Sequence, residues 1–172
     1  VYKRQMCCEP AAMSTPHFIV GMPRAATTWL CRCLNEHPDA VAFGETLYWG
    51  RLYEAPGEDG RYTPAQVETI TSRLAIGSSL AMLIGETPGS IRGLTTEGVA
   101  ALFGELRDSV DADGVTPVEL FDRMSAAFGA AAHATCVIEK TPHHLNWIDR
   151  ITAAYPCLLY TSDAADDWLR VG

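Results

Sequence analysis

Hydrophobic positions near the start of the chain change from a strand pattern to a helix pattern within a few residues. The apolar run 17–20 stops at Gly21 and Pro23, and so short a run fits a buried strand better than a helix. From Thr27 onward apolar residues recur at helical spacing, until Pro38 disfavours helical backbone angles in the residue before it. These residues are Trp29, Leu30, Cys33 and Leu34. The pattern predicts a strand, a tight turn and a helix.

The middle of the chain contains three amphipathic segments, which follow an exposed loop rich in Gly, Pro and acidic residues over 50–60. The first helix is expected over 63–76, with a threonine cap and a proline at its first position. The second is expected over 96–110. The third begins at Thr116, and Glu119 three residues later forms the signature of a capping box. We expect these helices to form an all-helical insertion that covers the functional site.

A second strand-and-helix unit follows the three helices. Residues 135–138 are a strand candidate, and 144–155 has the apolar spacing of a helix. A further strand is expected just before Glu45. Because strand followed by helix occurs twice, an α/β layered fold with a parallel sheet is the simplest assignment.

Composition narrows the class of protein. The chain has 172 residues, of which 48% are hydrophobic, enough for one domain without requiring two. Its 13 Lys and Arg against 21 Asp and Glu give a formal charge of −8, which disfavours a nucleic-acid partner. No apolar run approaches the roughly 20 residues of a membrane helix, and the start does not show the basic region and apolar segment that are typical of a signal peptide. We therefore expect a soluble, cytoplasmic protein without a membrane segment.

The two ends of the chain can be encoded by the two strands of one short DNA sequence. The start, 1–5, can be written GTGTATAAGAGACAG, and the reverse complement of this string, read from its second base, encodes Cys-Leu-Leu-Tyr-Thr, the run 157–161. Both strings resemble translated sequencing-library adapter, so we interpret 1–5 and 157–172 as adapter-derived tails. The natural stretch is then 6–156. It retains an odd number of cysteines without paired ligand spacing, which indicates reduced, buried thiols, with Cys33 packing its helix.

The segment 21–29 carries the chemistry that the sequence predicts. It lies where a strand leads into a helix, so unpaired N–H groups and the helix dipole form an anion site. Arg24 adds a planar fork suited to phosphate or sulfate, and Thr27 and Thr28 add hydroxyl donors. A plain helix cap with a surface arginine is the structural alternative. No lysine precedes Thr27 as in the G-x-x-x-x-G-K-[ST] motif, which disfavours a standard ATPase.

Three blocks of sequence, in order, resemble the sulfotransferases that use 3′-phosphoadenosine 5′-phosphosulfate (PAPS). The run 23–28 (PRAATT) is similar to their donor-binding loop, Pro-Arg/Lys-Ser-Gly-Thr-Thr. The runs 34–39 (LNEHPD) and 44–46 (GET) resemble the L-x-x-H-P-D…G-E segment of tyrosylprotein-type and related bacterial members. The run 139–145 (EKTPHHL) resembles a K-T-P or K-D-P block that precedes a helix.

This resemblance implies a three-layer, P-loop NTPase-like parallel sheet with a helical insertion. Residues 6–156 would be the N-terminal part of one sulfotransferase domain, truncated at its C-terminal end and inactive as written. The implied donor is PAPS, whose sulfuryl group passes to a hydroxyl or amine of a carbohydrate, peptide, lipid or small molecule. A P-loop kinase-like phosphotransferase and a non-catalytic anion-binding domain are the alternatives.

The resemblance also implies roles for individual residues. Glu45 matches the general base, and Lys140 could neutralise charge on the transferring group. The alternatives are a solvated glutamate and a surface lysine paired with Glu139 or Asp149. The donor-binding residues would be Arg24, Ala25, Ala26, Thr27, Thr28 and Trp29. We expect no metal, because carboxylates and cysteines at ligand spacing are missing around His37, His143 and His144.

The donor-binding loop departs from the family pattern at one place, because Ala25-Ala26 replaces Ser-Gly. Alanine disfavours a positive φ angle and adds a methyl group where backbone could approach the ligand. Either the loop has a helical geometry that tolerates alanine, or donor affinity is reduced. The tryptophans Trp29, Trp49 and Trp147 are expected as core or lid residues.

Overall fold

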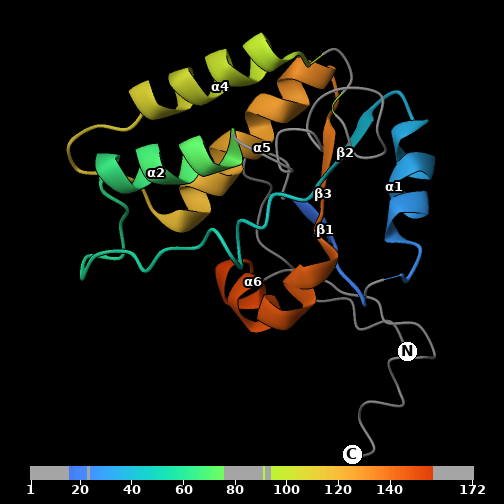
Figure 1. The fold of residues 1–172 in the computed structure, drawn as a ribbon, viewed down its shortest axis with the longest axis horizontal. Coiled ribbons are helices and arrows are strands. Elements are labelled where there is room, and N and C mark those ends of the chain that lie inside the picture. Colours follow the sequence, from blue (N-terminus) through green and yellow to red (C-terminus); the bar gives the residue numbers. More distant parts are fainter. Residues whose placement is uncertain (1–15, 23, 76–90, 92–93, 157–172) are drawn as a thin grey trace, which may run out of the picture.

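The computed structural model describes residues 16–22, 24–75, 91 and 94–156. Both predicted tails, Pro23 of the donor-binding loop, and Cys7 and Cys8 lie outside these described residues. Within them the chain forms a parallel sheet with the strand order β1-β3-β2 (Figure 1). The strands are β1 (His17–Ile19), β2 (Ala40–Gly44) and β3 (Cys136–Lys140).

The register of the sheet brings the ends of all three strands to one place. Lys140, the last residue of the central strand, lies opposite Ile19 on one side and Gly44 on the other. Because the strands are parallel, the segments that follow them leave from the same edge of the sheet, the lower edge in Figure 1. Ligands of open parallel sheets bind outside this carboxyl edge.

Helices cover both faces of the sheet. One face carries α1 (Thr27–Asn35), and the other carries α5 (Pro117–Ala132), with α2 (Pro64–Leu74) and α4 (Thr96–Asp108) packed beyond it (Figure 1). This arrangement confirms the predicted α/β fold with three layers around a parallel sheet. None of the helices in the described ranges is both long and apolar enough to cross a lipid bilayer.

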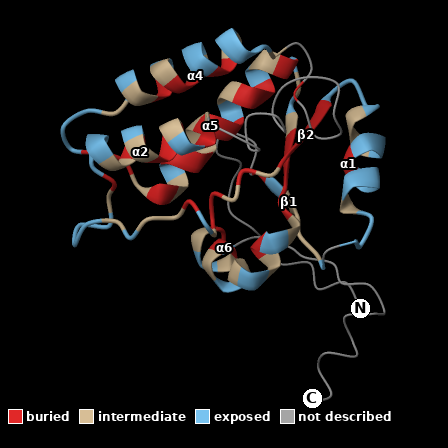
Figure 2. Cartoon of the chain, in the orientation of Figure 1, coloured by how far each residue is buried: buried red, intermediate tan, exposed pale blue. Residues whose placement is uncertain are grey.

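The core follows the alternation of side chains along the strands. On the α5 side, Val41, Phe43 and Val137 join the main hydrophobic core, which continues between the helices (Figure 2). On the α1 side, Ala42 and Ile138 pack with Cys31 in a smaller cluster. Most of the apolar packing therefore lies on the face away from α1.

The predicted helix starts at Thr63 and Thr116 are confirmed. Each threonine side chain accepts from the backbone N–H three residues later, where Gln66 or Glu119 completes a capping box. The predicted start near Thr96 is also confirmed, with Thr95 as the capping residue. Helix starts are local features, so the sequence alone identifies them.

The predicted single helix over 144–155 is wrong. The chain forms a 3₁₀ helix over Pro142–Trp147, followed by α6 (Ile148–Ala154). The tighter turn places the His144 side chain, which is fully buried, against the carboxylate of Glu139. A contact across the fold thus replaces the local helical preference.

Two expectations are also wrong: one about the position of the helical insertion, the other about the buried face of α1. The helical insertion lies on the face of the sheet opposite α1, and no residue of α2, α4 or α5 is among those lining the cavity described below. On α1, Cys33 is exposed and Cys31 is the buried thiol. The apolar stripe of α1 faces solvent in part, since Trp29 is 67% exposed, whereas Trp49 belongs to the core.

Candidate active site

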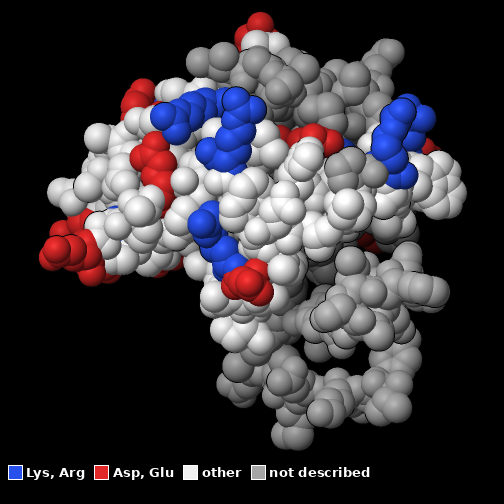
Figure 3. Space-filling model, turned by 60° about the horizontal axis from the view of Figure 1, so that its bottom comes forward, with Lys and Arg blue, Asp and Glu red and all other residues white. Residues whose placement is uncertain are grey.

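A cavity of about 650 Å³ opens at the carboxyl edge of the sheet, beside the first turn of α1. Three segments form its wall: the turn after β1 with the start of α1, the residue after β2, and the residues after β3. The lining residues are Arg24, Ala26, Thr27, Thr28, Trp29, Arg32, Glu45, Pro142 and His143. Figure 3 shows this edge of the molecule, where exposed Arg side chains lie on the side that carries α1 and also on the opposite side.

The first turn of α1 presents free hydrogen-bond donors to the cavity. The first helical bond runs from the N–H of Leu30 to the carbonyl of Ala26, and no side chain caps the helix. Among the described residues, no acceptor satisfies the N–H groups of Thr27, Thr28 and Trp29. A helix end of this kind binds anions, because these donors and the helix dipole point outward together.

The turn that precedes α1 is folded in an uncommon conformation. Arg24 has a φ of 74° and Ala26 a φ of 57°, both in the left-handed region that favours glycine. Of the two possibilities raised by the sequence, a helical geometry that tolerates alanine is therefore wrong. The N–H of Gly21 donates to the carbonyl of Pro142 at 3.3 Å, which ties this turn to the end of β3.

Glu45 and Lys140 form an ion pair although 95 positions separate them in the chain. Lys140 Nζ lies 2.8 Å from Glu45 Oε1, and the lysine side chain is 0% exposed while that of Glu45 is 35% exposed. The alternative of a surface lysine paired with Glu139 or Asp149 is therefore wrong. Gly44 allows this approach, since a Cβ there would lie 2.9 Å from Cε and 3.2 Å from Nζ of Lys140.

A second pair, formed by Glu139 and His144, is fully buried and begins at the residue that precedes Lys140 on β3. The carboxylate of Glu139 accepts hydrogen bonds from Thr46 and Thr141, and it lies 3.1 Å from His144 Nδ1. Burial opposes ionisation and is the largest influence on the pKa of Glu139. Attraction to His144 and the hydrogen bonds from His144, Thr141 and Thr46 together outweigh it, so this pKa lies below its ordinary value.

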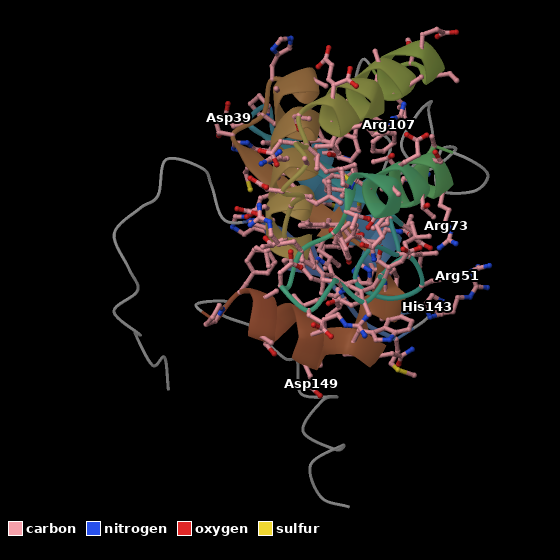
Figure 4. All side chains as sticks on the ribbon, turned by 90° about the vertical axis from the view of Figure 1, so that its left-hand side faces the viewer. Asp39, Arg51, Arg73, Arg107, His143 and Asp149 are labelled. Atoms are coloured by element: carbon pink, nitrogen blue, oxygen red, sulfur yellow. The ribbon has the colours of Figure 1, made fainter. Side chains whose placement is uncertain are left out.

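Two lining residues, Arg32 and His143, were given no role by the sequence analysis. Arg32 follows Thr28 by four positions and so shares its face of α1, a spacing that could have identified it. His143 follows Pro142 and, in Figure 4, lies at the opposite end of the molecule from Asp39, which precedes β2. Conversely, Ala25 and Lys140 are not among the lining residues, although Lys140 contacts one of them.

The comparison with protein families decides the assignment. A family model described as "Sulfotransferase family" matches residues 16–159, which contain the whole cavity wall. The chain belongs to the sulfotransferase family. Searches of curated proteins and of solved structures found no match to this sulfotransferase. In the described part of this sulfotransferase, no group of three or more His, Cys, Asp or Glu side chains could hold a metal ion.

Proposed function

We propose that this sulfotransferase transfers the sulfuryl group of PAPS to a hydroxyl or amine of an acceptor, with Glu45 as the general base. One observation carries the proposal. A carboxylate held by a buried lysine faces the same cavity as the unpaired N–H groups of an α-helix. Base and anion site are thus adjacent, as sulfuryl transfer between two bound substrates requires.

The donor would bind at the mouth of α1. The N–H groups of residues 27–29, the Thr27 and Thr28 hydroxyls and the Arg24 guanidinium supply donors for the phosphosulfate oxygens. The exposed ring of Trp29 offers an aromatic face to the purine of the donor. A cavity of about 650 Å³ is within the usual size range of sites for small ligands.

The chemical step assigned to Glu45 and Lys140 is a single displacement. Glu45 takes the proton of the acceptor while the oxygen or nitrogen of the acceptor forms a bond to sulfur. The bond between sulfur and the bridging phosphate oxygen breaks, and the electron pair leaves with adenosine 3′,5′-bisphosphate. Lys140 stabilises negative charge on the transferring and leaving groups, which explains a cation at this buried position.

Replacing Glu45 with Gln tests the proposal. In a complete enzyme, we expect Glu45→Gln to lower sulfuryl transfer from PAPS by at least about a hundredfold, because a general base contributes roughly 10²–10⁴-fold. The assay follows ³⁵S transfer from labelled PAPS to a panel of hydroxyl and amine acceptors and to water. Glu36→Gln removes the same charge from the exposed end of α1 and should leave the rate unchanged. Equal rates for wild type and Glu45→Gln would eliminate this assignment.

A kinase-like phosphotransferase is the competing function, since it would use the same helix mouth for ATP. The loop before α1 lacks the lysine that such enzymes place against the transferred phosphate. Transfer from PAPS in the presence of EDTA, without transfer from ATP and Mg²⁺, would support the sulfotransferase function. The reverse pattern would support the kinase.

A further inference from the structure

In the turn that follows Glu45, the N–H groups donate to side chains, while the carbonyl of Leu47 accepts from the N–H groups of Gly50 and Leu52. Four consecutive N–H groups donate to side-chain atoms: Thr46 to Glu139 Oε1 (3.3 Å), Leu47 to Thr141 Oγ1 (3.5 Å), Tyr48 to Thr46 Oγ1 (3.2 Å) and Trp49 to His144 Nε2 (3.2 Å). Three of these four acceptors come from the segment 139–144. The conformation of residues 46–49 therefore depends on a few side chains at the end of β3.

These side chains converge on Glu139. Its Oε1 accepts from the Thr46 hydroxyl at 2.8 Å and from the Thr141 hydroxyl, and its Oε2 lies 3.1 Å from His144 Nδ1. All four residues are 0–1% exposed. A buried carboxylate is costly unless its lone pairs are satisfied, and this one has a donor for each oxygen.

The proton on His144 is fixed by its neighbours. In the neutral ring, Nε2 accepts from the N–H of Trp49, so the ring proton lies on Nδ1 and donates to Glu139. A glutamine at 139 could not accept on both sides as the carboxylate does. If its amide oxygen accepts from His144, its NH₂ group faces the N–H of Thr46; in the other orientation its NH₂ group faces Nδ1–H of His144, and a change of tautomer would then oppose His144 to the N–H of Trp49.

Glu139 and Lys140 are neighbours on β3, so their side chains leave opposite faces of the strand. Lys140 reaches the side chain of Glu45, while Glu139 binds the residue after it, Thr46. We propose that Glu139, through His144 and Thr46, is a positioning residue that holds the turn 46–49 and thereby fixes Glu45 against Lys140. This inference rests on the proposed role of Glu45 as the base.

Hydrogen exchange of the amides of residues 46–49 tests the positioning directly, because each of them donates into the network. In Glu139→Gln we expect these amides to exchange on the order of tenfold faster under native conditions, as follows from losing a hydrogen bond to a charged group. Thr46→Val, which loses only the hydroxyl, should have the same effect if Glu139→Gln fails to fold. Tyr155→Phe is the matched control, since it removes a different bond to a carboxylate, the 2.8 Å bond to Asp122.

The kcat values of variants at Glu139 and His144 test whether the turn 46–49 affects catalysis. We expect Glu139→Gln to lower kcat roughly 10- to 100-fold, as misplacement of a catalytic group by about 1 Å does. The Kd for adenosine 3′,5′-bisphosphate should stay within about twofold, because the donor site is on α1. His144→Leu should lower kcat to a similar degree as Glu139→Gln. His144→Gln should lower kcat less, because glutamine retains one donor and one acceptor.

Two results would overturn the inference: unchanged exchange at 46–49 in Glu139→Gln, or faster exchange with unchanged kcat. Loss of kcat in Tyr155→Phe to the same degree would also count against it, since the effect would then reflect stability alone. Failure of the proposed function gives a different result. The wild type would then not bind adenosine 3′,5′-bisphosphate, while the exchange data would still report whether Glu139 holds the turn.

Discussion

Ala26 is one of two residues of the candidate donor site with a left-handed backbone conformation, the other being Arg24. Ala26 caps α1 with a φ of 57° and a ψ of 17°, a conformation that costs an alanine roughly 1–2 kcal/mol. Its N–H lies beside the donors proposed to bind the phosphosulfate. The strain is therefore located in the turn whose shape matters most for binding.

Replacing Ala26 with Gly should relieve this strain. We expect Ala26→Gly to raise the free energy of unfolding by about 1 kcal/mol, because the relief exceeds the extra chain entropy of glycine in the unfolded state. Urea denaturation measures the change. Ala25→Gly is the control, since Ala25 does not have a positive φ and its replacement should lower stability by roughly 0.5–1 kcal/mol. Similar losses of stability in Ala26→Gly and Ala25→Gly would contradict the presence of backbone strain at Ala26.

The two cysteines of α1 should differ in reactivity although one residue separates them. Cys31 is 0% exposed and donates to the carbonyl of Ala42, and burial raises its pKa to about 11 despite the nearby charge of Lys140. Cys33 is exposed. We expect iodoacetamide at pH 8 to alkylate Cys33 in the folded protein and Cys31 only after unfolding, as read by mass spectrometry. Equal labelling of both thiols in the folded protein would contradict the orientation of α1.

At the scale of elements, α5 depends on the capping box at its start. Thr116 and Glu119 exchange hydrogen bonds there, and the helix places Phe121, Met124 and Phe128 in the main core. We expect Thr116→Ala to lower the free energy of unfolding by about 1 kcal/mol, the usual cost of losing a cap. Thr69→Ala removes a hydroxyl from within α2 and should change stability much less.

The cost of Thr116→Ala should depend on pH. Hydrogen bonds from the backbone and side chain of Thr116 hold the pKa of Glu119 below its ordinary value of 4.5. A carboxyl group with a lowered pKa stabilises the fold above that value, and the contribution is lost as the pH falls through the lowered pKa. The difference between wild type and variant should therefore shrink below pH 4.5. If the difference in free energy of unfolding between wild type and Thr116→Ala did not change with pH, this would contradict the hydrogen bonds between Thr116 and Glu119.

The elements that could be predicted from the sequence are those with local signals. The proline and threonine pairs at 63–64 and 116–117 define helix starts, and the short apolar runs define strands. The 3₁₀ helix after β3 could not be predicted in this way, because it follows from the contact of His144 with Glu139. Nor could the inward face of α1, which is set by the packing of Cys31 on Ala42 and Ile138.

At the scale of the molecule, the strand order assembles the candidate site. β2 and β3 are parallel neighbours, and Gly44 lies opposite Lys140, so the residue after β2 meets the last residue of β3. The motifs suggested Glu45 and Lys140 separately, but their ion pair depends on which strands are adjacent. The same holds for His143, which reaches the cavity only because β3 lies beside β1.

We propose that the mouth of α1 holds the anionic end of a sulfuryl donor, and calorimetric titration with adenosine 3′,5′-bisphosphate measures this binding. We predict binding at one site that does not require Mg²⁺. Arg24→Gln should weaken the binding on the order of tenfold or more, because it removes a charged donor to the phosphate. Arg51→Gln, an exposed arginine outside the cavity wall, should bind like the wild type. No heat of binding to the wild type, or equal affinities of wild type and Arg24→Gln, would contradict the account.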